Sequence, residues 1–128
     1  MNKKYVFLLS HATERPFEVI VQMKTATNMK AFDEEAEICF FLMGEAVQLV
    51  KKGIAETITA ELEGKKIVVS EMLQTLLEDF GCKFYVCHAF LPSYGITEEN
   101  LVEGAELKSS SYLGELLLDG WIPLSLNL

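Results

Sequence analysis

Short apolar runs alternate along this chain with segments whose apolar residues recur at helical spacing. This alternation constrains the fold most strongly, because strands that alternate with helices pack as a mostly parallel sheet covered on both faces. Five runs have the character of buried strands: Tyr5 to Ser10, Glu37 to Met43, Lys83 to Cys87, Glu106 to Lys108 and Trp121 to Leu126. The sequence therefore predicts an α/β fold with a mostly parallel sheet of about five strands.

The segments between the runs carry helix start and stop signals. Helices are expected from Pro16 to between Met29 and Phe32, from Glu45 to Gly53, from Ser70 to Phe80, around Thr97 to Leu101, and from Tyr112 to Leu118. Pro16 suits the first turn of its helix, and Ser70 is positioned as an N-cap. The stretch from Thr57 to Leu62 alternates like an edge strand but is also compatible with a loop.

Length and charge narrow the class of protein. At 128 residues the chain fits one domain, residues 1–128, and is long enough to bury a conventional core. Its formal net charge of −8 opposes binding to nucleic acid and to anionic membranes, which both attract basic surfaces. No cleavage site follows the first apolar run, and no stretch approaches the ~18 apolar residues that cross a bilayer. We expect a soluble, cytoplasmic protein with neither nucleic acid nor membrane as partner.

The three cysteines, Cys39, Cys82 and Cys87, form no Cys-x-x-Cys pair. An odd number in a chain of this kind favours reduced thiols over a disulfide framework. Cys82 and Cys87 are separated by roughly 16 Å if they share one strand, whereas a disulfide needs Cα atoms within ~7 Å. Cys39 lies within an apolar strand and Cys82 at the start of one, so packing is the expected role of both.

Cys87 is the main candidate for chemistry. It ends a predicted strand, and ligands of open α/β sheets bind in the crevice beyond the carboxyl ends of the strands. A thiolate at that edge is a nucleophile. A small buried hydrophobe at a strand end is the other interpretation, because most free cysteines behave in that way.

Polar residues near the same edge are candidates to bind a ligand. His11 follows the first strand as Cys87 follows the third, so the two meet if their strands are neighbours or are separated by one strand. His88 follows Cys87 directly, but alternation points it to the other face unless the strand has ended. The remaining candidates are loop residues that either line a small polar pocket or face solvent: Glu14, Glu45, Ser93 and Tyr94.

Other chemistries are less well supported. Imidazole and thiolate are good zinc ligands, so His11, Cys87 and His88 define a rival metal site. These residues follow no recognised ligand spacing, and no metal is expected. Neither a Gly-x-Gly-x-x-Gly nor a Walker-type loop is present, so no nucleotide or other cofactor is expected either.

The order and spacing of several stretches resemble the pattern of a known family. These stretches are Phe40 to Gly53, Gly81 to Cys87, Gly95-Ile96, Leu101 to Leu107, and Trp121 to Leu124. The chain resembles the DsrE/DsrF-like family, which includes sulfur-relay subunits related to the Tus proteins. The resemblance implies a Rossmann-like three-layer α/β/α domain that often forms trimers or hexamers. It also implies a sulfur-carrying cysteine just after the strand that here ends at Cys87.

The resemblance leads to a functional hypothesis. Cys87 would carry sulfane sulfur as a persulfide in a sulfur-relay or sulfurtransferase-like protein, with sulfur donor and acceptor proteins as partners. The alternative is a non-catalytic oligomeric module that binds a small ligand or a protein at the carboxyl edge of its sheet. A homo-oligomer suits both, because the apolar tail from Trp121 to Leu128 would leave an exposed patch on a monomer.

Overall fold

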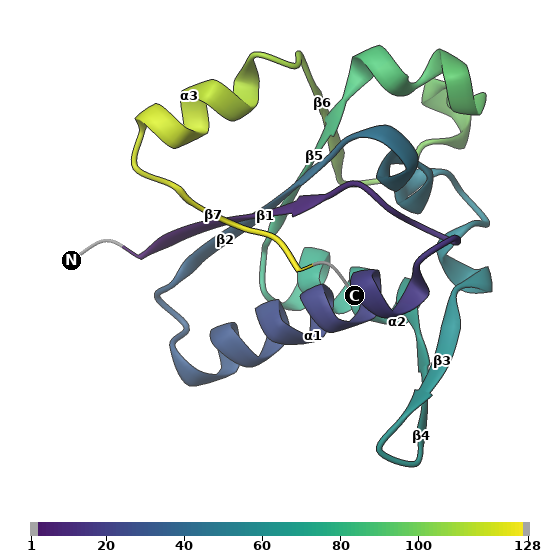
Figure 1. Ribbon diagram of the computed structural model, residues 1–128, viewed down its shortest axis with the longest axis vertical. Coiled ribbons are helices and arrows are strands. Elements are labelled where there is room, and N and C mark those ends of the chain that lie inside the picture. The colour runs from purple at the N-terminus through teal and green to yellow at the C-terminus, as the bar shows by residue number, and fades with distance from the viewer. Residues whose placement is uncertain (1–2, 127–128) are drawn as a thin grey trace.

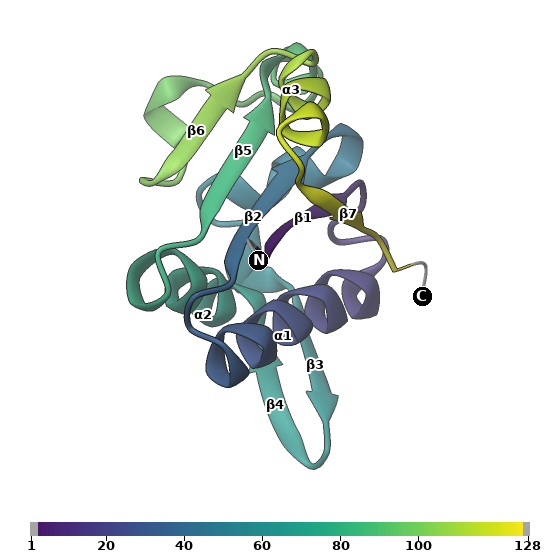
Figure 2. The same cartoon turned by 90° about the vertical axis from the view of Figure 1, so that its left-hand side faces the viewer.

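The computed structural model describes residues 3–126, and its centre is a sheet of five parallel strands (Figures 1 and 2). The strands are β1 (Lys4–Leu9), β2 (Glu37–Leu42), β5 (Lys83–Cys87), β6 (Ala105–Lys108) and β7 (Ile122–Leu124). They lie in the order β6-β5-β2-β1-β7, and every pair is parallel. The predicted α/β class and five-strand parallel sheet are confirmed.

Helices cover both faces of the sheet and complete three layers (Figure 1). α1 (Pro16–Phe32) and α2 (Val69–Gln74) lie against one face, and α3 (Tyr112–Leu118) lies against the other. The central strand β2 shows the effect of this double cover, because all of its residues after Glu37 are buried. Strands buried on both faces read as continuous apolar runs rather than as alternating ones, which is why β2 is easy to find in the sequence.

Two apolar clusters fill the spaces between the layers. The larger cluster lies between the sheet and α1 and α2, and it includes Phe7, Phe40 and Phe84 from three adjacent strands. The ring of Phe40 stacks on both of the others, with centroids 5.1 Å from Phe7 and 4.5 Å from Phe84. The smaller cluster lies under α3 and contains Cys39 and Cys87.

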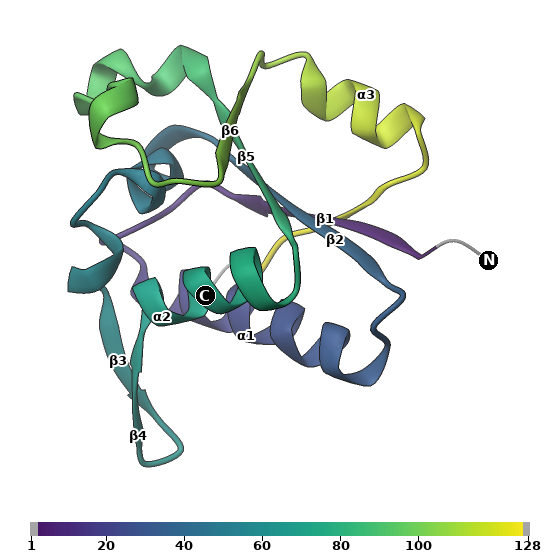
Figure 3. The ribbon, with the colours of Figure 1, turned by 180° about the vertical axis from the view of Figure 1, so that it is seen from behind.

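Of the two interpretations left open for residues 57–62, the strand is the one found for residues 59–62, although it does not belong to the main sheet. This strand is β3 (Thr59–Leu62), which pairs with β4 (Lys65–Val68) in a separate antiparallel two-stranded sheet that projects from the body (Figure 3). Glu63 and Gly64 form the turn between them, with φ of 54° and 76°. Positive φ at both central residues is the geometry of a type I′ hairpin turn.

Helix ends depart from expectation in places. The helix expected to start after Ser70 begins at Val69, and its N-cap residue Val68 forms no side-chain capping bond. The predicted N-cap role of Ser70 is therefore wrong, because that residue lies inside the first turn. The helix then widens into a π-turn at Thr75–Asp79, where the Phe80 amide donates to the Thr75 carbonyl at 3.2 Å.

Two other short segments turn out as 3-10 helices. The one after β2 covers Gly44–Val50, and the one after Thr97 covers Glu98–Asn100. Thr97 caps the second of these: its amide donates to the Asn100 side-chain oxygen at 2.7 Å in a reciprocal capping box. Ser111 holds the N-cap position of α3 without a side-chain capping bond.

Apolar side chains remain exposed where α3 leads into β7. Leu118 is 92% exposed and Ile122 is 48% exposed. The last two residues of the predicted apolar tail, 127 and 128, lie outside the described residues. Among residues 3–126, no helix combines the length and apolar character needed to cross a membrane.

Candidate functional site

Cys87 ends β5, and the chain then leaves the sheet in the 3-10 turn His88–Phe90. Parallel strands present their carboxyl ends at one edge, so the thiol lies at the edge where α/β proteins bind ligands. Its residue is 2% exposed and belongs to the apolar cluster under α3, which also contains Phe41 and Leu116. A reagent therefore reaches the sulfur only when the α3 layer opens locally around Cys87.

Three further side chains join Cys87 on the α3 face. Lys108 is the register partner of Cys87 on β6, and Tyr85 precedes Cys87 by two residues on β5. The ammonium nitrogen of Lys108 lies 5.6 Å from the ring centroid of Tyr85 and 4.5 Å from that of Tyr112. Sequence reasoning missed this group, which we call the Lys108 cluster: Lys108, Tyr85 and Tyr112. Only the pairing of β5 with β6 reveals it.

The other two cysteines are less suited to nucleophilic chemistry. Burial raises the pKa of Cys39 to about 12 and that of Cys82 to about 11. Both therefore remain protonated thiols at neutral pH, and a thiol is a poor nucleophile. All three cysteines are free and buried.

A separate polar group forms after β1. The Nδ1 atom of His11 is 3.2 Å from Glu14 Oε2, and Glu14 Oε1 accepts a hydrogen bond from the Ala12 amide at 2.6 Å. Burial acts to raise the pKa of Glu14, but hydrogen bonds from the Ala12 amide and from His11 outweigh it, so the pKa is lowered. His11 Nε2 also lies 3.9 Å from Glu18 Oε2. These partners belong to the α1 side of the sheet, whereas Cys87 belongs to the α3 side.

Glu45 and Tyr94 tie the loop after β5 to the 3-10 helix after β2. The Tyr94 hydroxyl donates to Glu45 Oε1 at 2.9 Å, and Lys51 Nζ donates to the Tyr94 carbonyl at 3.1 Å. The hydrogen bond to Glu45 raises the pKa of Tyr94. His88 and Ser93, by contrast, are exposed.

The structure thus joins four of the candidate residues in two pairs, His11 with Glu14 and Glu45 with Tyr94. It does not bring His11 next to Cys87, because β2 lies between β1 and β5 and the two side chains belong to different faces of the sheet.

Two buried polar side chains on α1 were not singled out from the sequence. Glu18 is 2% exposed and Gln22, one helical turn later, is fully buried. Over residues 3–126, Glu18 Oε2 and both amide atoms of Gln22 have no hydrogen-bond partner. Their positions four residues apart place them on one side of the helix. The apolar residues around them, such as Val19 and Met23, conceal them from a periodicity argument.

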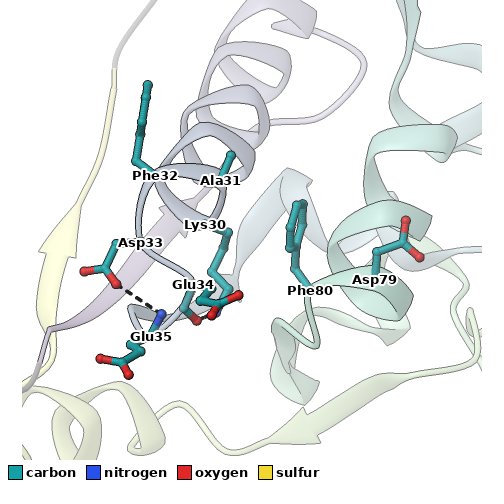
Figure 4. Close-up of a pocket in the computed structure, with 8 residues that line it drawn as sticks. All are labelled: Lys30, Ala31, Phe32, Asp33, Glu34, Glu35, Asp79 and Phe80. Carbon is teal, nitrogen blue, oxygen red and sulfur yellow. Dashed lines mark hydrogen bonds between the residues drawn. The ribbon is translucent and has the colours of Figure 1, made fainter.

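A hollow of about 740 Å³ lies away from all of these groups, at the turn that follows α1 (Figure 4). Acidic residues line much of it, with Glu34 and Glu35 on one side and Asp79 on the other. Asp33 there accepts from Lys3 Nζ at 2.9 Å and from the Glu35 amide at 3.1 Å. These bonds stabilise the turn itself, and none of the candidate site residues lines this hollow.

The structure does not support a metal site. Across the residues that it describes, no three His, Cys, Asp or Glu side chains are grouped so that they could hold a metal ion.

Comparison with known proteins decides the family. The model of the DsrE/DsrF-like family matches residues 3–125. This chain belongs to the DsrE/DsrF-like family. Proteins of this family generally act in sulfur relay, and the resemblance seen in the sequence is confirmed.

Solved structures agree on the fold. The chain is similar to the YchN protein of E. coli, with 18% identity, a TM-score of 0.78, and coverage of 97% of this chain and 99% of that one. It is also similar to protein MTH1491 of Methanobacterium thermoautotrophicum, with 18% identity, a TM-score of 0.77, and coverage of 96% of this chain and 98% of that one. A third similar structure is that of BT1422 of Bacteroides thetaiotaomicron, with 19% identity, a TM-score of 0.65, and coverage of 97% of this chain and 95% of that one. No curated protein matches the chain.

Proposed function

We propose that this DsrE/DsrF-like protein carries sulfane sulfur as a persulfide on Cys87. The observation that carries the proposal is the placement of Cys87 at the carboxyl end of β5 in a member of a sulfur-relay family. The raised pKa values of Cys39 and Cys82 support it further, because they make those two thiols poor nucleophiles at neutral pH. We place the protein in the cytoplasm, where thiols stay reduced.

The transfer has two balanced steps. The Cys87 thiolate attacks the outer sulfur of a donor persulfide, so a new S–S bond forms, the donor's S–S bond breaks, and the donor leaves as a thiolate. An acceptor thiolate then attacks the outer sulfur on Cys87 and restores the Cys87 thiolate. The sulfane sulfur moves at an unchanged oxidation level, so no external oxidant or reductant is required. Partner proteins supply the donor and acceptor sulfur atoms.

The test is sulfur loading read by mass spectrometry. Reduced protein is incubated with polysulfide, freed of excess reagent, and analysed as intact protein and as peptides. We expect a gain of one sulfur mass on the Cys87 peptide, reversed by reductant. Cys87→Ser should lose this adduct, whereas the matched control Cys39→Ser should keep it. An adduct that is absent, or spread evenly over the three cysteines, contradicts the carrier function.

A second candidate function has its own support. Cys87 is 2% exposed, and the buried polar atoms of Glu18 and Gln22 belong to the other face of the sheet. Those observations favour a non-catalytic module that binds a ligand or partner near His11 and Glu14. Such a module predicts no sulfur loading in the experiment above, so the same measurement separates the two functions.

We further propose that the protein assembles as a trimer or hexamer. The exposed apolar side chains of Leu118 and Ile122 support assembly, because contiguous exposed apolar surface commonly marks a contact with another chain.

A further inference from the structure

Lys108 is the last residue of β6 and the direct register partner of Cys87. Side chains of paired residues in adjacent strands point to the same face of a sheet, and adjacent strands lie about 4.8 Å apart. Lys108 and Cys87 therefore leave the backbone side by side, both toward the α3 layer. The side chain of Lys108 is partly buried, so much of its stem packs against the protein.

Two aromatic rings fix the position of the Lys108 ammonium group. Its nitrogen lies 4.5 Å from the ring centroid of Tyr112 and 5.6 Å from that of Tyr85. The two rings meet edge to face with centroids 4.9 Å apart. A cation over aromatic faces is attracted by the ring electrons but keeps its full charge. The cluster therefore holds a positive charge in place on the α3 face of the sheet, on the strand next to that of Cys87.

That charge has no carboxylate partner in the part of the chain that the structure describes. Within residues 3–126, no acidic oxygen lies within ion-pair distance of Lys108 Nζ. The acidic side chain two residues earlier, Glu106, pairs instead with Lys83 at 3.3 Å. In a chain with a formal net charge of −8, an ammonium group is suited to receive an anion when two tyrosines hold it on the strand next to that of Cys87 and no carboxylate of residues 3–126 pairs with it.

We propose that Lys108 selects anionic sulfane-sulfur donors for Cys87 by binding their negative end. This inference rests on the proposed function, in which the Cys87 thiolate is the nucleophile. Hydropersulfide, polysulfide and thiosulfate anions belong to the donor class. In each case the thiolate attacks the sulfane sulfur, one S–S bond forms as another breaks, and the electron pair leaves with the remainder of the donor.

The physical need for a cation follows from charge. An attacking thiolate and an anionic donor repel each other, and a positive charge held on the strand next to that of the thiol offsets part of that repulsion. Neutral reagents feel no such repulsion and gain little from Lys108. Selection of anions by Lys108 can therefore be measured as the ratio of two rate constants at Cys87, one for an anionic reagent and one for a neutral reagent of similar shape.

Haloacetate labelling measures that ratio. Iodoacetate and iodoacetamide alkylate thiolates by the same displacement, but only iodoacetate is an anion. Rate constants for both are measured on the Cys87 peptide of the full chain. We expect Lys108→Met to lower the iodoacetate-to-iodoacetamide ratio by about three- to tenfold. Any change in the thiol's own reactivity alters both rates together and cancels in the ratio.

Matched variants keep the result interpretable. Lys83→Met makes the same charge change at the far end of β5 and should leave the ratio unchanged. Lys108→Arg keeps the cation and should retain most of the ratio. Raising the salt concentration should lower the ratio in the native protein but not in Lys108→Met, because salt screens the attraction. An unchanged ratio in Lys108→Met, or an equal loss in Lys83→Met, overturns donor selection by Lys108.

The two proposals can fail separately. If polysulfide loads Cys87 in wild type and in Lys108→Met, and the iodoacetate-to-iodoacetamide ratio is the same in both, the carrier function stands and the role of Lys108 is overturned. If the ratio falls in Lys108→Met but no sulfur adduct forms, Lys108 attracts anions and the carrier function is overturned. If neither haloacetate reaches Cys87 in the folded protein, the thiol is closed to solutes and both proposals are overturned.

Discussion

The three thiols of this protein experience different surroundings within one small sheet. Burial holds the pKa of Cys39 at about 12 and that of Cys82 at about 11. We expect iodoacetamide at pH 8 to modify Cys87 first in the folded protein, and to reach Cys39 and Cys82 only after unfolding in urea. Peptide mass spectrometry over a time course measures this order. Modification of all three at one rate would contradict it, and Cys87→Ser should abolish the early phase.

A second residue-scale prediction concerns pH and Glu14. Hydrogen bonds outweigh burial and lower its pKa below the ordinary value of 4.5. A carboxylate with a depressed folded-state pKa stabilises the protein above its unfolded pKa, and this stabilisation is lost as the pH falls through the folded-state value. Glu14→Gln should therefore lower the urea midpoint at pH 7, with a smaller difference from wild type at pH 3.

Glu103→Gln is the control for that measurement. Glu103 is exposed, and it forms no ion pair among residues 3–126. Its urea midpoint should match that of wild type at both pH values. A difference for Glu14→Gln that stays constant from pH 7 to pH 3 would show that charge at this position does not contribute.

Individual site residues differed in how far the sequence could predict them. Cys87 was accessible to reasoning because a strand end is a local feature of the sequence. Lys108 was not, because its place beside Cys87 depends on the lateral order of β5 and β6 and on their register. Glu18 was missed for a different reason: a buried carboxylate inside an apolar helix face looks like an ordinary helix position until its burial is known.

At the scale of elements, the β3–β4 hairpin gives a direct test of backbone conformation. Gly64 has φ of 76° and open space around the position of a Cβ atom. Gly64→Ala should therefore lower the free energy of unfolding by about 1 kcal/mol through backbone strain alone. Urea denaturation followed by circular dichroism measures the change.

Gly114 provides the opposite case. It lies in α3, also with open space around its Cβ position, and its φ is not positive. Gly114→Ala should raise the free energy of unfolding by roughly 0.5–1 kcal/mol, because alanine is the better helix former. If both substitutions shift stability in the same direction, the contrast between turn and helix geometry is not the cause.

The elements also show where sequence patterns reach their limit. All five strands of the main sheet were predicted. Burial on both faces makes the central strand β2 an almost unbroken apolar run, whereas every residue of the edge strands β6 and β7 is partly or fully exposed. The hairpin was left open because Glu63-Gly64 lacks the asparagine or aspartate that usually marks a type I′ turn. The start of α2 was misplaced at Ser70 because a serine that suits an N-cap can also occupy the first turn.

At the scale of the whole molecule, apolar side chains beside α3 are exposed in the part of the chain that the structure describes. We expect light scattering to give a molar mass of three or six times that of the chain. Replacing Leu118, which is 92% exposed, by glutamate should weaken association by tenfold or more, since a fully buried leucine contributes roughly 1.5–3 kcal/mol. Phe32→Glu is the control, because Phe32 is 89% exposed but lies at the C-terminal end of α1, on the opposite face of the sheet from α3. Equal effects of the two substitutions would contradict an interface at Leu118.

The composition of β7 has a consequence for how the sheet can extend. Among residues 3–126, β7 pairs only with β1, so its outer side is an open edge of the described sheet, and Pro123 lies at its middle. A strand that joined this edge would need amide donors, and proline offers none. β6 at the opposite edge contains no proline. Growth by strand addition is therefore one-sided: a further strand can continue the sheet past β6, whereas copies that meet at β7 must adhere through side chains.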